Sequence, residues 1–324
     1  MFDSLRNLPK LLSVKRIWNQ APHNAFTDLL YHRNEWLCAF RESDTHENPE
    51  VGSIRLIASP DGTVWSPRAW IDSPGADLRD PKVSVMPDGR LLLLVGRTRS
   101  RPGTSYLTHD TCVSFSEDSV TWTPLQQVLE DGEWLWRLTW NGDVGYGVSY
   151  SYTDPEDHRL PWNIKLFQTR NGIQYQFMTQ LAVPGYPSET TLRFGNHGEL
   201  IALVRREAVE DGGAWIGFSP SPFTDWSWHP LEYHLEGPDF LAVADGSFWA
   251  AGRIWHDPGN QQAAPFPSTA LCRIARTVCT PMIVLPSAGD SSYPGLVIQD
   301  NILWMSYYST HEGQTAIYLA KIQL

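Results

Sequence analysis

The chain has 324 residues, of which 42% are hydrophobic and 19% charged, and this composition excludes a wholly disordered protein. The formal net charge of −11 argues against a sequence-independent nucleic-acid binder, because such proteins carry a basic footprint. The 24 glycines, 24 prolines and 15 tryptophans are typical of short strands joined by turns, with aromatic faces or pockets.

The N-terminal segment carries no sign of a secretory leader. Residues 1–6 lack an apolar stretch, and no 18-residue apolar run occurs along the chain. The sequence as it stands therefore predicts a cytoplasmic protein that does not bind membranes, or a secreted or periplasmic one if a leader has been removed. Residues 1–20 are expected to form an N-terminal extension or a closing strand.

Six short hydrophobic strands, each ending in a large polar residue, follow in chain order. They span 36–41, 92–97, 145–150, 200–205, 248–253 and 302–307, at intervals of 48 to 56 residues. Proline, glycine and β-branched residues interrupt every long window that would favour a helix. A unit of roughly 50 residues is the size of a four-stranded propeller blade. The sequence thus predicts an all-β protein, a six-bladed β-propeller of four-stranded antiparallel blades forming a single domain over residues 1–324.

A recurring turn motif supports the same repeat. It reads Ser-Pro-Asp-Gly-Thr-Val-Trp over 59–65 and Ser-Glu-Asp-Ser-Val-Thr-Trp over 116–122, with degenerate copies at 169–175 and 219–226. The serine and aspartate side chains can cap backbone N–H groups of the turn. Four tryptophans are expected to pack the blades, namely Trp65, Trp122, Trp226 and Trp249. The four cysteines show no CxxC spacing and are expected to be buried free thiols, at Cys38, Cys112, Cys272 and Cys279.

The first strand of each predicted blade carries residues that a propeller would point at its central channel. They are Asp80, Arg137, Glu189, Asp239 and Tyr293, taken as equivalent positions of different blades, and the first blade offers 24–28 there. Because inner strands surround the channel, we expect these side chains to converge. This convergence of carboxylates, an arginine and a tyrosine predicts a functional site.

At these residues the chain resembles the sialidase superfamily, glycoside hydrolases with Asp-box (BNR) repeats on a six-bladed propeller. The resemblance covers roughly residues 20–324. It implies that Glu189 and Arg205 are the catalytic glutamate and a carboxylate-binding arginine of the family. It also implies that Tyr293 is the nucleophile, supported by Glu312. The resemblance further implies that Arg253 stands for another arginine of the family's triad.

The chain departs from this family at the first arginine of the triad. Where the family has Phe-Arg-Ile-Pro, residues 24–27 read Asn-Ala-Phe-Thr, so Arg41 or Arg79 would have to substitute. The loop that carries the general acid in the family corresponds to 41–48 and offers several candidates. The substrate is then sialic acid or a different sugar, expected to be acidic.

A tyrosine nucleophile needs a general base, because an unperturbed phenol has a pKa near ~10 and is therefore protonated at neutral pH. Glu189 is expected to take the proton from Tyr293. His46 is a candidate general acid, since histidine titrates near neutral pH, and Asp44 or Glu47 are alternatives. Asp80 is either catalytic or a turn residue before a proline.

Arginines at the ends of apolar strands are expected to bind a sugar carboxylate through two parallel hydrogen bonds. The alternative is that they form ion pairs that link neighbouring blades. The cluster of Trp134, Trp136 and Trp140 is expected to combine blade packing with one sugar-stacking face. No two histidines have ligand spacing on one strand, so no metal or other cofactor is expected. The full set expected to bind substrate is Arg41, Arg79, Arg97, Arg137, Arg205, Arg253, Asp239, Tyr307, His311 and Glu312.

The leading hypothesis is an exo-acting glycoside hydrolase that cleaves a terminal sugar with a tyrosine nucleophile, a known exception to the two-carboxylate scheme. One alternative is a polysaccharide lyase acting on a glycan that contains uronate, where a tyrosine or histidine removes a proton. Another is a non-catalytic carbohydrate-binding propeller, because propellers host many functions. In each case the expected partner is a carbohydrate and not nucleic acid.

Overall fold

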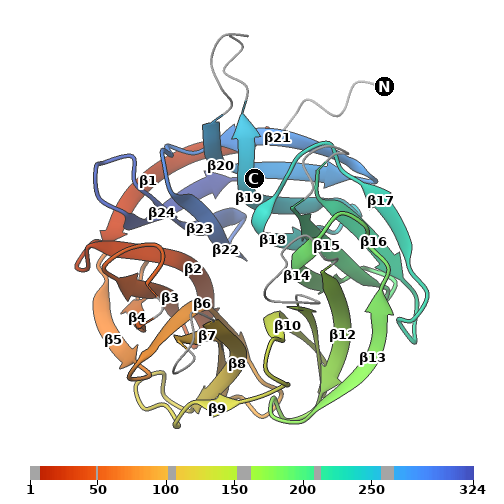
Figure 1. The fold of residues 1–324 in the computed structure, drawn as a ribbon. Helices are drawn as coiled ribbons and strands as arrows, with labels where there is room; N and C mark the ends of the chain where they lie inside the picture. The colour runs from red at the N-terminus through yellow and green to blue at the C-terminus, as the bar shows by residue number, and fades with distance from the viewer. Residues whose placement is uncertain (1–7, 49, 101–106, 152–161, 208–212, 257–265) are drawn as a thin grey trace.

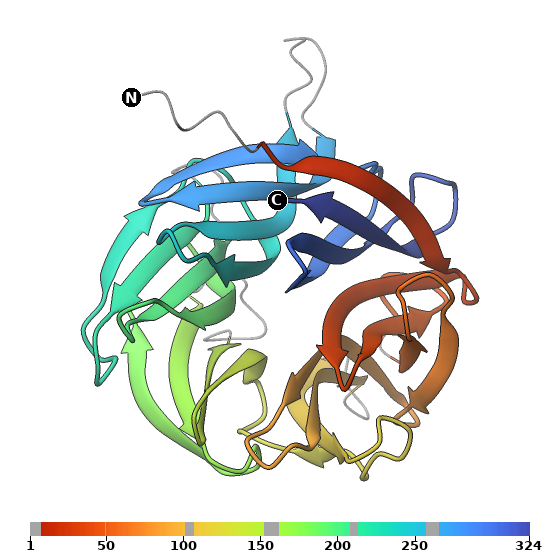
Figure 2. The same ribbon diagram turned by 180° about the vertical axis from the view of Figure 1, so that it is seen from behind.

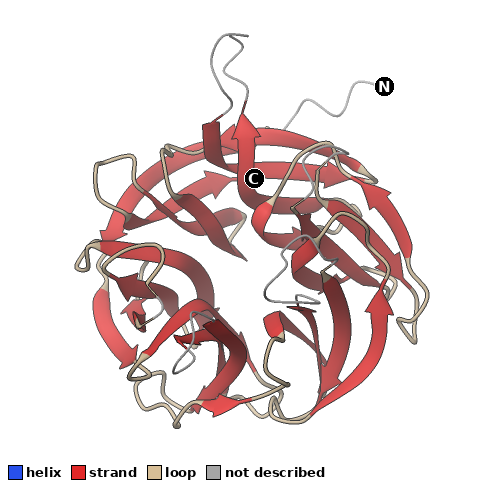
Figure 3. Ribbon diagram, viewed as in Figure 1, coloured by secondary structure: helices blue, strands red, loops and turns tan. Residues whose placement is uncertain are grey.

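The computed structural model describes residues 8–48, 50–100, 107–151, 162–207, 213–256 and 266–324. These residues form antiparallel blades arranged in a ring around a central channel (Figure 1). The described part of the chain consists of strands, loops and turns, without a helix (Figure 3). It accordingly contains no helix long and apolar enough to cross a membrane. The predicted fold class, an all-β propeller of six four-stranded blades, is confirmed.

Each blade contains four strands. The bounds are, blade by blade, β2 (His23–His32), β3 (Glu35–Ser43), β4 (Val51–Ser59) and β5 (Ser66–Ile71); β6 (Ala76–Val85), β7 (Leu91–Ser100), β8 (Leu107–Ser116) and β9 (Gln126–Gln127); β10 (Trp134–Asn141), β11 (Val144–Ser151), β12 (Asn163–Thr169) and β13 (Tyr175–Leu181); β14 (Pro187–Phe194), β15 (Leu200–Arg206), β16 (Trp215–Ser219) and β17 (Ser227–Pro230); β18 (Glu236–Ala242), β19 (Phe248–His256), β20 (Phe266–Ala275) and β21 (Val278–Val284); and β22 (Ser291–Gln299), β23 (Ile302–Ser309), β24 (Ala316–Gln323) and β1 (Lys10–Trp18). The six hydrophobic strands expected from the sequence are the second strands of the blades.

The sixth blade is built from both ends of the chain. Its outer strand β1 pairs antiparallel with β24, from Lys10 opposite Gln323 to Trp18 opposite Ile317. Figure 2 shows this N-terminal strand in red along the dark-blue C-terminal strand. The ring is therefore closed by hydrogen bonds between the two ends of the chain, because β1 supplies the fourth strand of the last blade.

Hydrophobic side chains fill the spaces between neighbouring blades. One cluster joins Leu37 of β3 to Leu93 of β7, and another joins Ile201 of β15 to Ala250 of β19. The four tryptophans expected to pack the blades lie in such clusters, which confirms that prediction. The four cysteines are buried and free, as expected.

The turns between third and fourth strands are capped by side chains in three blades. Asp61, Asp118 and Asn171 each accept two backbone N–H groups of their own turn, at 2.7 to 3.4 Å. In the second blade these bonds, led by the one from Thr121, lower the pKa of Asp118 to about 2. These turns join the two outer strands of their blades, and we assign the capping side chains a structural role.

A β-bulge interrupts the inner strand of every blade. Two residues of the inner strand oppose one residue of the second strand in each blade, and this extra residue turns the side chains there toward the channel. The bulged pairs are Phe26-Thr27, Asp80-Pro81, Trp136-Arg137, Ser188-Glu189, Gly237-Pro238 and Tyr293-Pro294. Proline suits the second position of three bulges, because it has no N–H to leave unpaired.

The bulges correct one expectation from the sequence. Asp80 and Tyr293 occupy the first bulge position, whereas Arg137 and Glu189 occupy the second and Asp239 follows the bulge. The sequence spacing suggested that the five residues occupy equivalent positions, and the structure shows that they do not. The extra residue of a bulge shifts the register between the inner strand and the second strand by one residue. The position of the bulge cannot be counted back from the end of the second strand, because its distance from that end differs between blades.

Candidate active site

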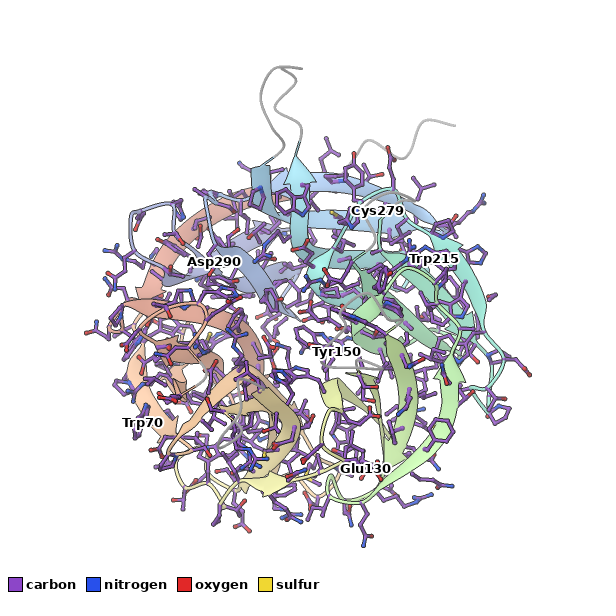
Figure 4. All side chains as sticks on the ribbon, viewed as in Figure 1. Trp70, Glu130, Tyr150, Trp215, Cys279 and Asp290 are labelled. Carbon is purple, nitrogen blue, oxygen red and sulfur yellow. The ribbon has the colours of Figure 1, made fainter. Side chains whose placement is uncertain are left out.

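A cavity of about 130 Å³ lies where five of the six blades converge. Its wall carries both aromatic rings and titratable groups. Tyr150, one of the residues that line the cavity, lies close to the centre of the ring of blades in Figure 4, whereas Trp70 lies at the periphery. The lining residues are Phe26, His46, Arg79, Asp80, Thr98, His109, Gly132, Trp134, Tyr150, Glu189 and Tyr293.

Tyr293, Glu189 and Arg205 form a hydrogen-bonded cluster at this cavity. The Tyr293 hydroxyl donates to Glu189 Oε1 over 2.6 Å, a short bond to a charged acceptor. Arg205 Nη1 donates to the same carboxylate oxygen over 2.8 Å and to the Tyr293 oxygen over 3.0 Å. The other oxygen of Glu189 accepts the backbone N–H of Gly237 at 2.7 Å. The structure thus brings together the three residues that the sequence grouped as nucleophile, base and arginine.

The Tyr293 ring is held rigidly. The rings of Phe26 and Trp136 meet it edge-on, with centroids 5.0 and 5.7 Å away. Glycine at 237 (φ +62°) is required beside it, because a Cβ there would lie 2.6 Å from Tyr293 Cγ. Burial, and next the charge of Glu189, hold the pKa of Tyr293 well above its ordinary value, so the hydroxyl carries its proton at neutral pH.

Asp80 faces the cavity as a buried carboxyl group. It is 8% exposed, its φ is +49°, and its Oδ1 has no hydrogen-bond partner among the described residues. Burial raises the pKa of Asp80 to about 6; Glu189 adds to the rise, and Lys82 opposes it. Lys82, 3% exposed, rests on the Trp136 ring with Nζ 4.4 Å from its centroid. A strained backbone and a raised pKa at one residue are features of functional sites.

A second carboxylate, Asp290, organises the neighbouring wall. His46 Nδ1 and His23 Nε2 lie 2.6 and 2.8 Å from its Oδ2, and the Tyr308 hydroxyl donates to its Oδ1 over 2.8 Å. Burial alone would raise the pKa of Asp290, but the hydrogen bonds from His23 and His46 hold it well below its usual range. His46 therefore reaches the cavity with its Nδ1 fixed on Asp290.

The two histidines and Asp290 also have the residue types of a metal site. One ligand atom from each of His23, His46 and Asp290 lies within 4.8 Å of the others. The separations of 2.6 and 2.8 Å between the ring nitrogens and one carboxylate oxygen are hydrogen-bond lengths, and hydrogen bonds account for the cluster.

Three of the predicted arginines lie near the cavity and are paired with acidic side chains. Arg79 Nε is 2.9 Å from Asp77, and Arg253 Nη1 donates to Glu236 over 2.7 Å. Arg205, besides contacting Glu189, lies 2.9 Å from Glu207. Arg79 lines the cavity itself, and its guanidinium carbon lies 5.2 Å from the centroid of the Phe26 ring.

Arg41 and Arg137 lie outside the cavity wall and link blades. Arg41 is fully buried and donates from Nε to Asp77 over 2.6 Å, joining the first blade to the second. Arg137 donates to Asp28 over 2.8 Å and lies 3.6 Å from Asp239. The structure gives these residues, including Asp239, the alternative role of inter-blade ion pairs.

Four further predicted residues are not brought to the cavity. Arg97 forms a two-pronged pair with Asp110 within the second blade, at 3.0 and 3.1 Å. The Tyr307 hydroxyl donates to a backbone carbonyl at Pro286 over 3.0 Å. His311 packs on the Tyr318 ring with centroids 4.5 Å apart. Glu312 accepts a hydrogen bond from Arg16 over 2.8 Å on the surface and does not line the cavity.

Several site residues escaped sequence reasoning. His23, Asp77 and Asp290 each precede a first bulge residue by three positions, and so does Glu133 in the third blade. This periodic acidic or histidine position is a signal that sequence inspection could have used. Of the tryptophan cluster, Trp134 lines the cavity, Trp136 supports Tyr293, and Trp140 donates to Ser84 over 3.2 Å.

Comparisons with known proteins show the fold. No protein-family model matches the chain, and no curated protein sequence matches it significantly. A solved structure of a Dyadobacter fermentans protein of unknown function is 15% identical, with a TM-score of 0.82, over 98% of this chain and 99% of that one. Penicillium chrysogenum alpha-L-arabinanase, complexed with arabinobiose, is 11% identical, with a TM-score of 0.66, over 96% and 98%.

A Trypanosoma rangeli sialidase in complex with sialic acid is also similar. It is 12% identical, with a TM-score of 0.66, over 97% of this chain and 58% of that one. The predicted resemblance to sialidase-like propellers is thereby confirmed at the level of the fold.

Proposed function

We propose that this protein is an exo-acting glycoside hydrolase with Tyr293 as nucleophile and Glu189 as its base. The observation that carries the proposal is the 2.6 Å hydrogen bond from Tyr293 to Glu189, at a cavity lined by several aromatic residues. Aromatic walls with a few convergent polar groups are typical of sugar sites. The similar structures that are named as an arabinanase and a sialidase add support from the fold.

In the first step the Tyr293 oxygen attacks the anomeric carbon of the terminal sugar. The phenolic proton moves to Glu189 as the new bond forms, since the raised pKa of Tyr293 disfavours a free phenolate. Arg205, 3.0 Å from the phenolic oxygen, stabilises the negative charge that develops there. The glycosidic C–O bond breaks, and its oxygen leaves with a proton from Asp80.

Asp80 suits this role because burial raises its pKa to about 6, so that it holds a proton at mildly acidic pH. In the second step the Asp80 carboxylate takes a proton from water, and the resulting hydroxide attacks the anomeric carbon. The bond to Tyr293 breaks, and Glu189 returns its proton to the phenolic oxygen. His46, fixed on Asp290, offers its other ring nitrogen to a sugar hydroxyl.

A panel of chromogenic aryl glycosides, neutral and acidic, tests the proposal with Tyr293→Phe. Wild type should hydrolyse at least one member, and the variant should lose turnover by on the order of 10³-fold or more. Tyr307→Phe is the matched control, because Tyr307 is also buried and its hydroxyl donates to a backbone carbonyl outside the cavity. The control should retain turnover.

Three outcomes would contradict the proposal. Undiminished turnover by Tyr293→Phe would show that Tyr293 is not the nucleophile. An unsaturated, ultraviolet-absorbing product would indicate a lyase. Sugar binding without cleavage of any panel member would indicate a binding protein.

A further inference from the structure

Each of the arginines beside the cavity already has at least one acidic partner. Arg253 donates from Nε to the Ser291 carbonyl over 2.9 Å and from Nη1 to Glu236 over 2.7 Å, while its Nη2 lies 3.5 Å from Asp290. Burial acts to lower the pKa of Arg253, but Tyr308, Tyr293 and Glu236 raise it above its ordinary value. Each of the three guanidinium nitrogens of Arg253 thus has an acceptor within the protein.

Arg205 and Arg79 are paired in the same way. Arg205 lies between Glu189, at 2.8 Å, and Glu207, at 2.9 Å. Arg79 lies 2.9 Å from Asp77. A sugar carboxylate would have to displace one of these partners, and displacing Asp77 or Glu189, whose side chains are 2% and 5% exposed, is costly.

Carboxylates balance or outnumber cations around the cavity. Among the described residues the cations at and behind its wall are Arg41, Arg79, Lys82, Arg137, Arg205 and Arg253, and the carboxylates that line it or pair with these cations are Asp28, Asp77, Asp80, Glu189, Glu207, Glu236, Asp239 and Asp290. An anionic sugar therefore gains no net attraction from its surroundings.

The wall itself offers groups that suit a neutral sugar. Asp80 faces the cavity with an Oδ1 that has no hydrogen-bond partner among the described residues and can accept a hydrogen bond from a sugar hydroxyl. A sugar carboxylate has no proton to donate at neutral pH and would meet the carboxylates of Asp80 and Glu189 as a like charge. Phe26 and Trp134 present aromatic surface, against which the C–H face of a sugar ring packs.

We infer that the terminal sugar bound at this site is neutral, in contrast to the acidic sugar expected from the sequence. The inference rests on the proposed glycosidase function, since both concern the same cavity. Its carrying observation is that Arg79, Arg205 and Arg253 each have a carboxylate partner within 3 Å.

Matched substrate pairs test the inference: aryl glycosides of glucose and glucuronic acid, and of galactose and galacturonic acid. Each pair differs only at C6, where a hydroxymethyl group replaces a carboxylate. The preferred pair should be hydrolysed with a kcat/KM at least tenfold higher for its neutral member. A tenfold preference for the acidic member would overturn the inference and leave the glycosidase proposal standing.

Glu207→Gln probes the cause of the preference. It removes one carboxylate from Arg205, and Glu207 does not line the cavity. The variant should narrow the neutral-over-acidic ratio several-fold, because Arg205 becomes available to an anion. Glu35→Gln is the matched control, since Glu35 is similarly exposed and pairs with Arg68. It should leave the ratio unchanged; equal ratios in wild type and Glu207→Gln would refute the charge argument.

Binding separates this inference from the proposed function. The affinities of Tyr293→Phe for free glucose, galactose, glucuronate and galacturonate are measured by calorimetry. Tighter binding of the neutral sugars without hydrolysis by wild type would support the inference and refute the hydrolase. Failure of all four sugars to bind, together with no hydrolysis of their glycosides, would refute both.

Discussion

Burial of Asp80 should cost folding stability at neutral pH. Its pKa rises from the ordinary 3.8 to about 6 in the folded protein, where the side chain is 8% exposed. A difference of roughly two pKa units corresponds to about 3 kcal/mol. The folded protein binds this proton more tightly than the unfolded chain does. The contribution of Asp80 to the free energy of unfolding is therefore present in full below about pH 4 and is lost as pH rises through about 6.

Asp80→Asn keeps the shape of the side chain and removes its ionisation. Relative to wild type, the variant should gain up to about 3 kcal/mol in the free energy of unfolding between pH 4 and pH 8. Urea unfolding followed by tryptophan fluorescence at several pH values measures this difference. Parallel pH profiles of wild type and variant would refute the assignment of a raised pKa to Asp80.

Asp88→Asn serves as the control for this measurement. Asp88 lies on an exposed turn, where a side-chain hydrogen bond from Arg90 lowers its pKa. Because its shift has the opposite sign, the control should show no gain in relative stability as pH rises. A gain equal to that of Asp80→Asn would mean that the effect does not depend on burial.

The remaining predictions concern the supports of the site. Gly237→Ala should lower turnover at least tenfold, because its Cβ would press on Tyr293, whereas Gly246→Ala, also at positive φ but with open space, should keep turnover. Equal turnover of the two variants in the aryl glycoside assay would refute this support for Tyr293. Asp77→Ala should cost about 3–5 kcal/mol in urea unfolding, since Arg41 would be left buried without its partner. A loss below about 1 kcal/mol would show that the pair does not hold the two blades together.

The fold could be predicted because its signals are periodic. A turn motif and a hydrophobic strand repeat about every 50 residues, and the structure places each repeat in a blade. The inner-strand residues were harder to place, since a bulge shifts the register by one residue without a fixed sequence signature. Glu189 and Tyr293 were nonetheless singled out, because they lie at inner-strand beginnings of different blades and match the blade order of the sialidase superfamily, and both line the cavity.

Sequence reasoning placed Tyr307 at the site, and the structure places Tyr308, not Tyr307, behind the cavity wall on Asp290. Neighbouring residues of a strand point to opposite faces, so an error of one position moves a side chain from the cavity side to the blade interface. The Tyr308 hydroxyl bonds to Asp290, whereas Tyr307 stacks on Tyr318 between strands. Arg41 illustrates a different limit, because sequence gives its position and not its partner, Asp77.

The most direct test of the central claim is to trap the covalent intermediate. A fluorinated, activated glycoside of the best neutral substrate slows the second step, and mass spectrometry then locates the attached sugar. The account predicts one sugar on the peptide that contains Tyr293, and none on Tyr293→Phe. An adduct on another residue, with hydrolysis persisting in Tyr293→Phe, would contradict it.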